Sequence, residues 1–275
     1  MKYIFIAYAN ERMAYSLKRI GRQARKLGLF DEIILYTPDS LPESFRNIEL
    51  MQHRIGGGYW AWKPYIIWET LQHHDEGDVV CYVDAGCTLH KTSEWNVYIE
   101  LMKRYDNVLF SYPDEIPQWE SFGTTSTIIK HWAKKTAVDA YDEMTGGQEW
   151  RECNKVLGGF IWAKGRDNVL IREWLDIVMN RPDLIKDPDM SEEQYSFYVR
   201  HKHDQPAVTA LTYKYRGKCL VLPELLDEGP RNAAVVATRI RANNLSAYIV
   251  CLFKLYLRRI FGDEKVDRFK SFLHI

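Results

Sequence analysis

One aspartate lies where ligands usually bind in an α/β protein. The segment GDVVCYVDAGCTLH reads as a buried strand that ends in Asp84, and the small residues Ala85 and Gly86 follow it. In open α/β sheets, ligands bind at the carboxyl ends of the strands. A carboxylate there can hold Mg²⁺ or Mn²⁺, which in turn binds phosphate oxygens. The structural alternative is that Asp84 caps a turn.

A second segment, GGGYWAWKPYIIW, places aromatic rings beside a cation. Three glycines permit an unusual backbone path, and Tyr59, Trp60 and Trp62 stand next to Lys63. The rings could hold a base or a sugar while Lys63 neutralises a phosphate. The segment is not a P-loop, because it lacks GxxxxGK[ST]. The alternative is an aromatic hinge packed on the core, with Lys63 in solvent.

Two later segments contain residues that could complete a site. In VLGGFIW, Gly158 and Gly159 would allow a ligand or another backbone to approach closely. In RHKHDQPAV, Asp204 and Gln205 precede an amphipathic helix. Asp204 either caps this helix or acts as a general base.

The turn after the first expected strand, AYANER, lacks GxGxxG, which disfavours a dinucleotide-binding Rossmann site. A nucleotide could still lie at that strand end and touch Tyr8, Asn10 or Arg12.

The elements that must position these residues alternate along the chain. Apolar runs predict strands, and helical spacing predicts helices between them. This order predicts an α/β domain with a mostly parallel sheet, flanked by helices and connected by right-handed crossovers. The expected strands are 3–7, 31–37, 78–83 (which runs into a turn within 77–86), 107–112, 155–165 (with a Gly-Gly interruption) and 218–222. The expected helices are 13–27, 64–74, 93–105, 124–142 (one or two helices), 167–180 and 205–216.

Composition excludes several classes of protein. The chain has 275 residues, with 37 Lys and Arg against 37 Asp and Glu, which argues against a nucleic-acid binder. No apolar run is long enough to span a membrane, and the first residues read as a strand rather than a signal peptide. Five cysteines without a CxxC pair disfavour a zinc site or a disulfide framework. Free thiols fit a cytoplasmic protein.

The C-terminal part differs in charge from the rest. Residues 231–275 contain nine Lys or Arg and three Asp or Glu. Within them, residues 245–262 predict a basic amphipathic helix, a pattern typical of helices that lie on a membrane surface. The alternatives are a helix docked on the domain or a dimer contact. We therefore expect a domain over residues 1–230 and a helical extension over residues 231–275.

Taken in order, five segments resemble nucleotide-sugar-dependent glycosyltransferases of GT-A fold, a Rossmann-related α/β fold. The likeness is strongest to bacterial capsule and O-antigen enzymes, including galactofuranosyltransferase-like ones. It spans residues 3–208 and is carried by YIFIAYAN, GGGYWAWKPYII, YVDAG, GGFIWAK and HDQPAV.

The resemblance implies transfer of a hexosyl residue from a UDP-sugar, with galactofuranosyl as a candidate residue. The acceptor would be a hydroxyl of a growing surface polysaccharide or lipid-linked glycan. Asp84 matches the first Asp of the DxD motif, which holds Mn²⁺ or Mg²⁺ on the donor diphosphate. Gly86 stands in place of the second Asp. Inversion would use Asp204 as the base. A polyprenyl-diphosphate acceptor would place the enzyme peripherally on the anionic inner face of the cytoplasmic membrane.

The resemblance and the residues together give three groups. The catalytic candidates are Asp204 and Asp84, and the metal candidate is Asp84. The donor-binding candidates are Tyr8, Asn10, Arg12, Tyr59, Trp60, Lys63, Asp84, Ala85 and Gly86. The sugar- or acceptor-binding candidates are Trp62, Gly158, Gly159, Phe160, His203 and Gln205.

Two other functions use the same residues. A metal-dependent nucleotidyl or phosphoryl transferase would turn over a nucleoside triphosphate without a sugar acceptor. A non-catalytic sugar-binding protein would keep its ligand affinity when Asp84 is removed.

Overall fold

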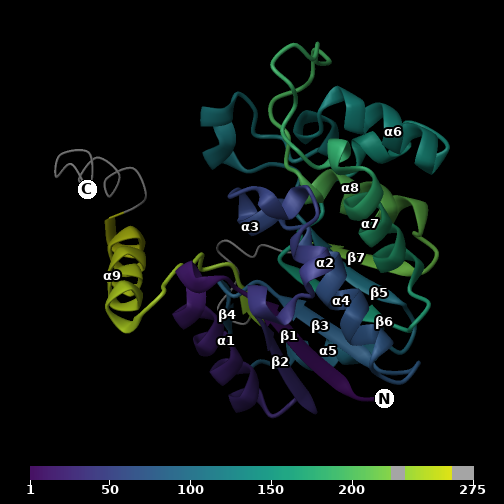
Figure 1. The fold of residues 1–275 in the computed structure, drawn as a ribbon. Helices are drawn as coiled ribbons and strands as arrows, with labels where there is room; N and C mark the ends of the chain where they lie inside the picture. Colours follow the sequence, from purple (N-terminus) through teal and green to yellow (C-terminus); the bar gives the residue numbers. More distant parts are fainter. Residues whose placement is uncertain (224–232, 262–275) are drawn as a thin grey trace.

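A six-stranded sheet forms the centre of the protein in the computed structural model, which describes residues 1–223 and 233–261, without the side chains of 258–261 (Figure 1). The strand order is β2-β1-β3-β6-β5-β7. Only β6 runs antiparallel to its neighbours, so the expectation of a mostly parallel α/β sheet is confirmed. The strands are β1 (Tyr3–Tyr8), β2 (Glu32–Tyr36), β3 (Val79–Val83), β5 (Asn107–Ser111), β6 (Phe160–Lys164) and β7 (Cys219–Pro223).

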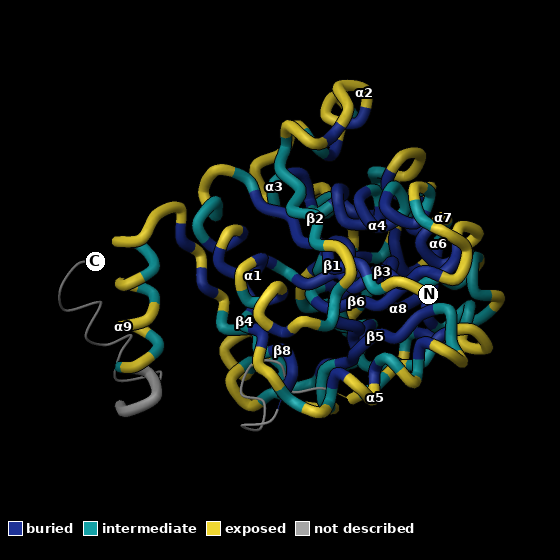
Figure 2. Tube along the Cα trace, turned by 90° about the horizontal axis from the view of Figure 1, so that it is seen from below, coloured by how far each residue is buried: buried dark blue, intermediate teal, exposed yellow. Residues whose placement is uncertain are grey.

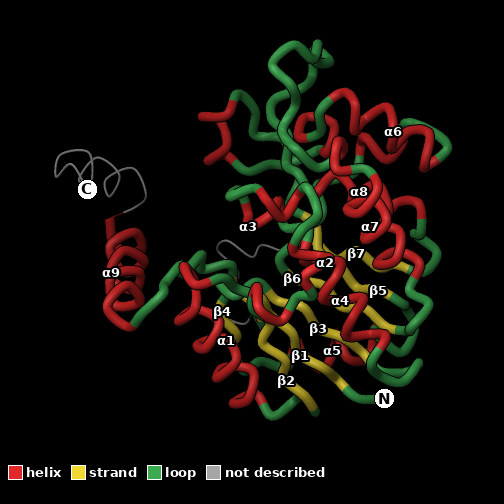
Figure 3. Tube along the Cα trace, viewed as in Figure 1, coloured by secondary structure: helices red, strands yellow, loops and turns green. Residues whose placement is uncertain are grey.

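Helices cover both faces of this sheet (Figure 3). One face packs against α1 (Ala14–Leu27) and α5 (Glu94–Leu101). The other packs against α4 (Trp62–Gln72), α6 (Lys135–Thr145), α7 (Val169–Asn180) and α8 (Asp204–Lys214). Burial on both faces explains why β1 and β3 are continuous apolar runs instead of alternating ones.

Within each strand, alternate side chains enter opposite cores. In β1, Ile4 and Ile6 join the core under α4, whereas Phe5 and Ala7 join the core under α1. At the end of α1, Gly28 has a φ of 66°, the left-handed conformation that ends many helices.

Two expected elements differ from the structure. The expected helical region 124–142 contains a 3₁₀ turn (Ile129–Trp132) and then α6, whereas residues 124–128 are not helical. The expected strand over 155–165 becomes regular only at Phe160, because Gly158 and Gly159 form a turn before β6.

Residues 233–242 of the predicted C-terminal extension belong to the main body. The short strand β8 (Val235–Val236) pairs with β4 (Thr88–Leu89). Beyond it, Ser16 Oγ donates a hydrogen bond to the carbonyl of Ile240 at 2.8 Å.

The helix α9 (Leu245–Phe261) projects from this body in both views (Figures 1 and 2). It confirms the expected helix over 245–262 as far as residue 261, and residues 262–275 lie outside the described part. The ring centroids of Tyr248 and Tyr15 on α1 lie 5.2 Å apart. Several large apolar side chains on α9 are exposed. No helix within the described ranges is both long and apolar enough to cross a membrane.

The aromatic core offers a test of the fold. Phe160 is fully buried, and its ring stacks on that of Phe110 at a centroid distance of 4.3 Å. We expect Phe160→Ala to lower the free energy of unfolding by about 3–5 kcal/mol, measured by urea denaturation. Val97→Ala, an exposed position on α5, is the control and should change it little. Equal effects of the two variants would contradict this packing.

Candidate active site

Three of the charged residues selected from the sequence, Lys63, Asp84 and Asp204, meet at one edge of the sheet. β1 and β3 are parallel. Tyr8, the last residue of β1, and Asp84, the residue after β3, therefore lie at the same edge of the sheet. β6 is antiparallel to β3, with Phe160 opposite Val83, so Gly158 and Gly159 enter from that edge too. This edge is therefore the place where a ligand of an α/β sheet would bind.

Lys63 is the centre of this group. It lies in the first turn of α4, and only 4% of its side chain is exposed. Its Nζ donates to the carbonyl of Gly158 at 2.8 Å and to Asp204 Oδ2 at 3.2 Å, and lies 3.7 Å from Asp84 Oδ1. The structural alternative required the Lys63 side chain to lie in solvent. The side chain is instead buried and paired within the protein.

The charge of Lys63 is stabilised by two carboxylates. Burial is the largest single influence and acts to lower the pKa of Lys63. Asp204 and Asp84 act in the opposite direction and together outweigh it, so the pKa is raised above its ordinary value. Lys63 therefore keeps its proton at neutral pH and ties the two aspartates together.

Asp84 is the carboxylate that faces solvent. Its side chain is 40% exposed, against 8% for Asp204. Its Oδ1 accepts a short hydrogen bond from the hydroxyl of Tyr82, and its backbone N–H donates to the carbonyl of Gly159 at 2.9 Å. The side chain thus accepts a hydrogen bond from Tyr82 and forms an ion pair with Lys63, rather than capping a turn.

Asp204 occupies a different place from the one a cap would take. It is the first residue of α8, and the N-cap position before it belongs to His203. Its buried carboxylate pairs with Lys63 instead. Gln205, next along the helix, is half-buried.

The two glycines before β6 make room for these charges. A Cβ on Gly158 would lie 2.9 Å from Asp204 Oδ2 and 3.1 Å from Lys63 Nζ. A Cβ on Gly159 would lie 3.0 Å from Asp84 Oδ2. Glycine is required here by a close approach within the protein itself. Phe160, by contrast, directs its side chain into the core under α5, away from this edge.

The glycine and aromatic segment forms a tight left-handed turn. Every residue from Gly56 to Trp60 has a positive φ, from 50° at Tyr59 to 103° at Gly58. Trp62 then turns inward, where its indole N–H donates to the carbonyl of Gly56 at 3.1 Å. This turn leaves Trp60 half-buried beside the charged group.

The rings of this turn fall into two sets. Trp62 is buried and stacks on Tyr8 with centroids 4.0 Å apart, so this pair is mainly core. Tyr59 and Trp60 flank His203, with centroids 5.0 and 5.6 Å from its ring. Burial lowers the pKa of His203, so this ring is neutral at neutral pH. His203 itself has a φ of 53°.

The first βα turn lies against the glycine turn. Asn10 Oδ1 accepts a hydrogen bond from the backbone N–H of Arg12 at 3.2 Å. The Asn10 amide nitrogen would lie 3.5 Å from a Cβ on Gly57. Arg12 is exposed, whereas Tyr8 is buried and burial raises its pKa to about 12. The structure therefore brings Asn10 near the glycine turn and leaves the Arg12 guanidinium at the surface.

Sequence reasoning missed two residues that hold the Asp84 turn. Tyr82 lies within an apolar run, where its hydroxyl carries no separate signal. Arg19 lies on the buried side of α1 and donates to the hydroxyl of Thr88 at 2.9 Å and to the carbonyl of Ala85 at 3.3 Å. A cation among the apolar positions of an amphipathic helix is the signal that could have found Arg19.

The donor set at Asp84 does not fit a protein-built metal site. Within residues 1–223 and 233–261, no three His, Cys, Asp or Glu side chains come together as metal ligands. Asp204 is committed to Lys63, and Gly86 supplies no side chain. A divalent cation would have a single carboxylate here, already beside an ammonium group.

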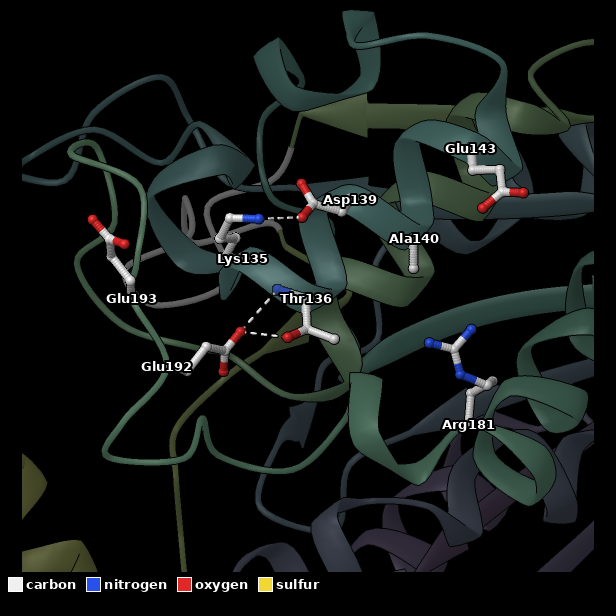
Figure 4. Close-up of a pocket in the computed structure, with 8 residues that line it drawn as sticks. All are labelled: Lys135, Thr136, Asp139, Ala140, Glu143, Arg181, Glu192 and Glu193. Atoms are coloured by element: carbon white, nitrogen blue, oxygen red, sulfur yellow. Dashed lines mark hydrogen bonds and ion pairs between the residues drawn. The ribbon is translucent and has the colours of Figure 1, made fainter.

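Figure 4 shows a different, open pocket beside α6. Four of its charged groups, those of Lys135, Asp139, Arg181 and Glu192, already have partners. Lys135 Nζ lies 2.6 Å from Asp139 Oδ2, and the backbone N–H of Thr136 donates to Glu192 at 2.9 Å. None of the residues selected from the sequence lines it. We therefore place the candidate site at the edge beyond β1 and β3.

Comparison with known proteins gives structural similarity only. No family model and no curated protein matches the chain. A glycosyltransferase involved in glycosylation of the major capsid of PBCV-1 is 7% identical, with a TM-score of 0.43 over 81% of this chain and 83% of its own. For mouse xyloside xylosyltransferase 1 the values are 10%, 0.42, 81% and 85%. For core-mannan synthase A of Aspergillus fumigatus, in an Mn/GDP form, they are 9%, 0.38, 81% and 73%. Likeness at this level leaves function to be argued from the site.

The buried Lys63 offers a test of the site. Lys63→Met leaves the buried Asp204 carboxylate without its cation, and we expect a loss of about 3–5 kcal/mol in unfolding free energy at pH 7. Adding Asp204→Asn should restore part of that loss. Lys103→Met, which removes a surface partner of Glu100, is the control. Strictly additive effects of the two site substitutions in urea denaturation would refute the pairing.

Proposed function

We propose that this protein is a glycosyltransferase that uses a nucleoside diphosphate sugar as donor. The observation that carries the proposal is the exposed Asp84 at the carboxyl end of β3, held by Lys63 and Tyr82 beside an aromatic turn. The order of segments that resembles GT-A glycosyltransferases supports the same reaction. In an α/β sheet such an edge receives the ligand.

The two carboxylates differ in what they can do. Asp84 can accept a hydrogen bond from a sugar or ribose hydroxyl, because its side chain is partly in solvent. Asp204 is buried against Lys63. This geometry favours a role in positioning Lys63 rather than the predicted role of general base. In this proposal Asp84 is the carboxylate that contacts substrate.

The rings beside the charged group supply a stacking surface. Trp60 is half-buried and stacks on the neutral ring of His203. Such faces bind a nucleobase or the apolar face of a sugar. We propose that Trp60 and His203 line the ligand, with Asn10 and Arg12 nearby at the end of β1.

Finer specificity rests on the sequence resemblance. It supports a UDP-sugar donor and inversion at the sugar. The residue transferred would be a hexosyl residue, of which galactofuranosyl is the candidate that the resemblance names. It also supports a bacterial polysaccharide or polyprenyl-diphosphate-linked acceptor. A phosphoryl or nucleotidyl transferase, or a sugar-binding protein, would use the same edge and is distinguished by the next experiment.

Calorimetry with UDP, GDP, CDP and dTDP, followed by turnover of the matching sugar nucleotide, tests the proposal. We expect one diphosphate to bind selectively, and Asp84→Asn to lower turnover about 100-fold or more while the fold is kept. Asp167→Asn, an exposed aspartate that follows the end of β6 opposite to Gly158 and Gly159, is the control. Turnover of a nucleoside triphosphate alone would indicate the phosphoryl transferase. Ligand binding that ignores Asp84→Asn would indicate a binding protein.

We also propose that α9 lies on an anionic membrane surface at the cytoplasmic face. The apolar side chains of Ile249, Val250 and Phe253 are exposed, and Lys254 is exposed beside them. The neighbouring α1 has Lys18 exposed on its outer face. Apolar side chains with adjacent cations suit the interface of an anionic bilayer.

Flotation with vesicles tests this membrane contact. We expect the full chain to float with vesicles that contain phosphatidylglycerol. Phe253→Glu should reduce the bound fraction about tenfold or more, because an aromatic ring that enters the bilayer on binding is lost. Val97→Glu, exposed on α5, serves as the control. Flotation that is the same for both variants and the unaltered chain would exclude α9 as the contact.

A further inference from the structure

The chain returns from its C-terminal part to cover the Asp84 turn. Thr238 Oγ1 and the backbone N–H of Ile240 both donate to the carbonyl of Gly86 at 3.0 Å. Thr238 Oγ1 also lies 2.8 Å from the hydroxyl oxygen of Thr88. Arg239 is the residue between these two anchors. Its Cα would lie 3.7 Å from a Cβ on Gly86.

Arg239 is held in an unfavourable backbone conformation. Its φ is 52°, in the left-handed region, and its side chain is exposed. This conformation costs a residue with a Cβ about 1 kcal/mol or more, and such strain often occurs at functional sites. The bonds of Thr238 and Ile240 to Gly86 hold it there. The turn thus places the backbone of Arg239 next to the Asp84 turn.

A second cation lies next to two residues of the candidate site in the chain. Lys202 directly precedes His203 and Asp204, and its Nζ lies 5.3 Å from the ring centroid of Trp132. Burial lowers the pKa of Lys202, and the charges of Arg200 and Arg239 lower it further. The electrostatic effect of Arg239 therefore reaches Lys202.

The charges around Asp84 suit an anion better than a divalent cation. Lys63 pairs with Asp84 and Asp204, and Asp187 lies beside His203, while the cations Arg200 and Arg239 act on the neighbouring Lys202. The Gly86 carbonyl, which could be a metal ligand, accepts two hydrogen bonds from the returning chain. Guanidinium and ammonium groups bind phosphate oxygens directly, the guanidinium with two parallel bonds.

We propose that Arg239 and Lys202 bind the diphosphate of the donor and neutralise its negative charge, as a divalent cation would otherwise do. This inference rests on the proposed glycosyl transfer. In the reaction the bond between the anomeric carbon and the diphosphate oxygen breaks, and the electron pair stays on the nucleoside diphosphate. Arg239 and Lys202 stabilise that added charge. The acceptor oxygen forms the new bond to the anomeric carbon, and its proton leaves to a base or to water.

The test measures affinity for UDP, or for whichever of the four diphosphates binds, in EDTA and then in Mn²⁺. We expect the unaltered chain to bind in EDTA, with less than a twofold change on adding Mn²⁺. Arg239→Gln and Lys202→Gln should each weaken diphosphate binding about tenfold or more. They should weaken binding of the nucleoside monophosphate less, because it lacks the second phosphate. Lys18→Gln, an exposed cation on α1, is the control.

Arg239→Gly separates a binding role from a structural one. It removes the guanidinium and also relieves the left-handed strain, so the melting temperature should stay or rise while diphosphate affinity falls. A lower melting temperature with unchanged affinity would assign Arg239 a structural role and overturn the proposal.

The remaining outcomes are distinct. Binding that disappears in EDTA and returns with Mn²⁺ would overturn the proposal and leave the glycosyltransferase function intact. Both glutamine variants behaving like Lys18→Gln would do the same. An unaltered, folded chain that binds no nucleoside diphosphate, with or without Mn²⁺, would overturn the proposed function and this inference with it.

Discussion

The candidate site depends on one buried ammonium group. Lys63 is enclosed in protein, and its charge is tolerable only because two carboxylates and a carbonyl face it. That requirement explains the glycines before β6, since any side chain at Gly158 would collide with the ion pair. It also explains why Asp204 begins a helix in the interior. The site is thus built from charges that satisfy one another.

The same arrangement divides the work between carboxylates. The buried carboxylate of Asp204 pairs with Lys63, whereas the carboxylate of Asp84 is partly exposed to solvent. Tyr82, with its pKa raised well above the ordinary value mainly by burial, stays protonated and fixes Asp84 from the side. A rigid partner on each side orients the one carboxylate that a ligand can reach. This is the preorganisation that binding and catalysis both need.

Much of the fold could be predicted from the sequence, because apolar runs and helical spacing report burial directly. The position of Asp84 at a strand end followed from the same pattern. Phe160 was selected as a sugar- or acceptor-binding candidate, and its burial in the core was not foreseen, because the Gly158–Gly159 turn hides where the alternation of β6 begins. The return of residues 235–242 could not be predicted, since two-residue strands have no sequence pattern of their own. Tyr82 was missed because its hydroxyl carries no separate signal within an apolar run, whereas Arg19 carried one, a cation among the apolar positions of α1, that was not used.

The contact between the C-terminal return and the Asp84 turn also bears on how the protein is made. Ser16 bonds to Ile240, and Gly86 accepts from Ile240, so residues near both ends of the chain meet at the site. A ribosome releases the N-terminal residues long before residue 240 is added. The sheet can therefore form first, while the covering over the Asp84 turn waits until residues 238–242 have been added. A nascent chain that has not reached residue 238 would have the carboxylate at the sheet edge without the segment that covers its turn.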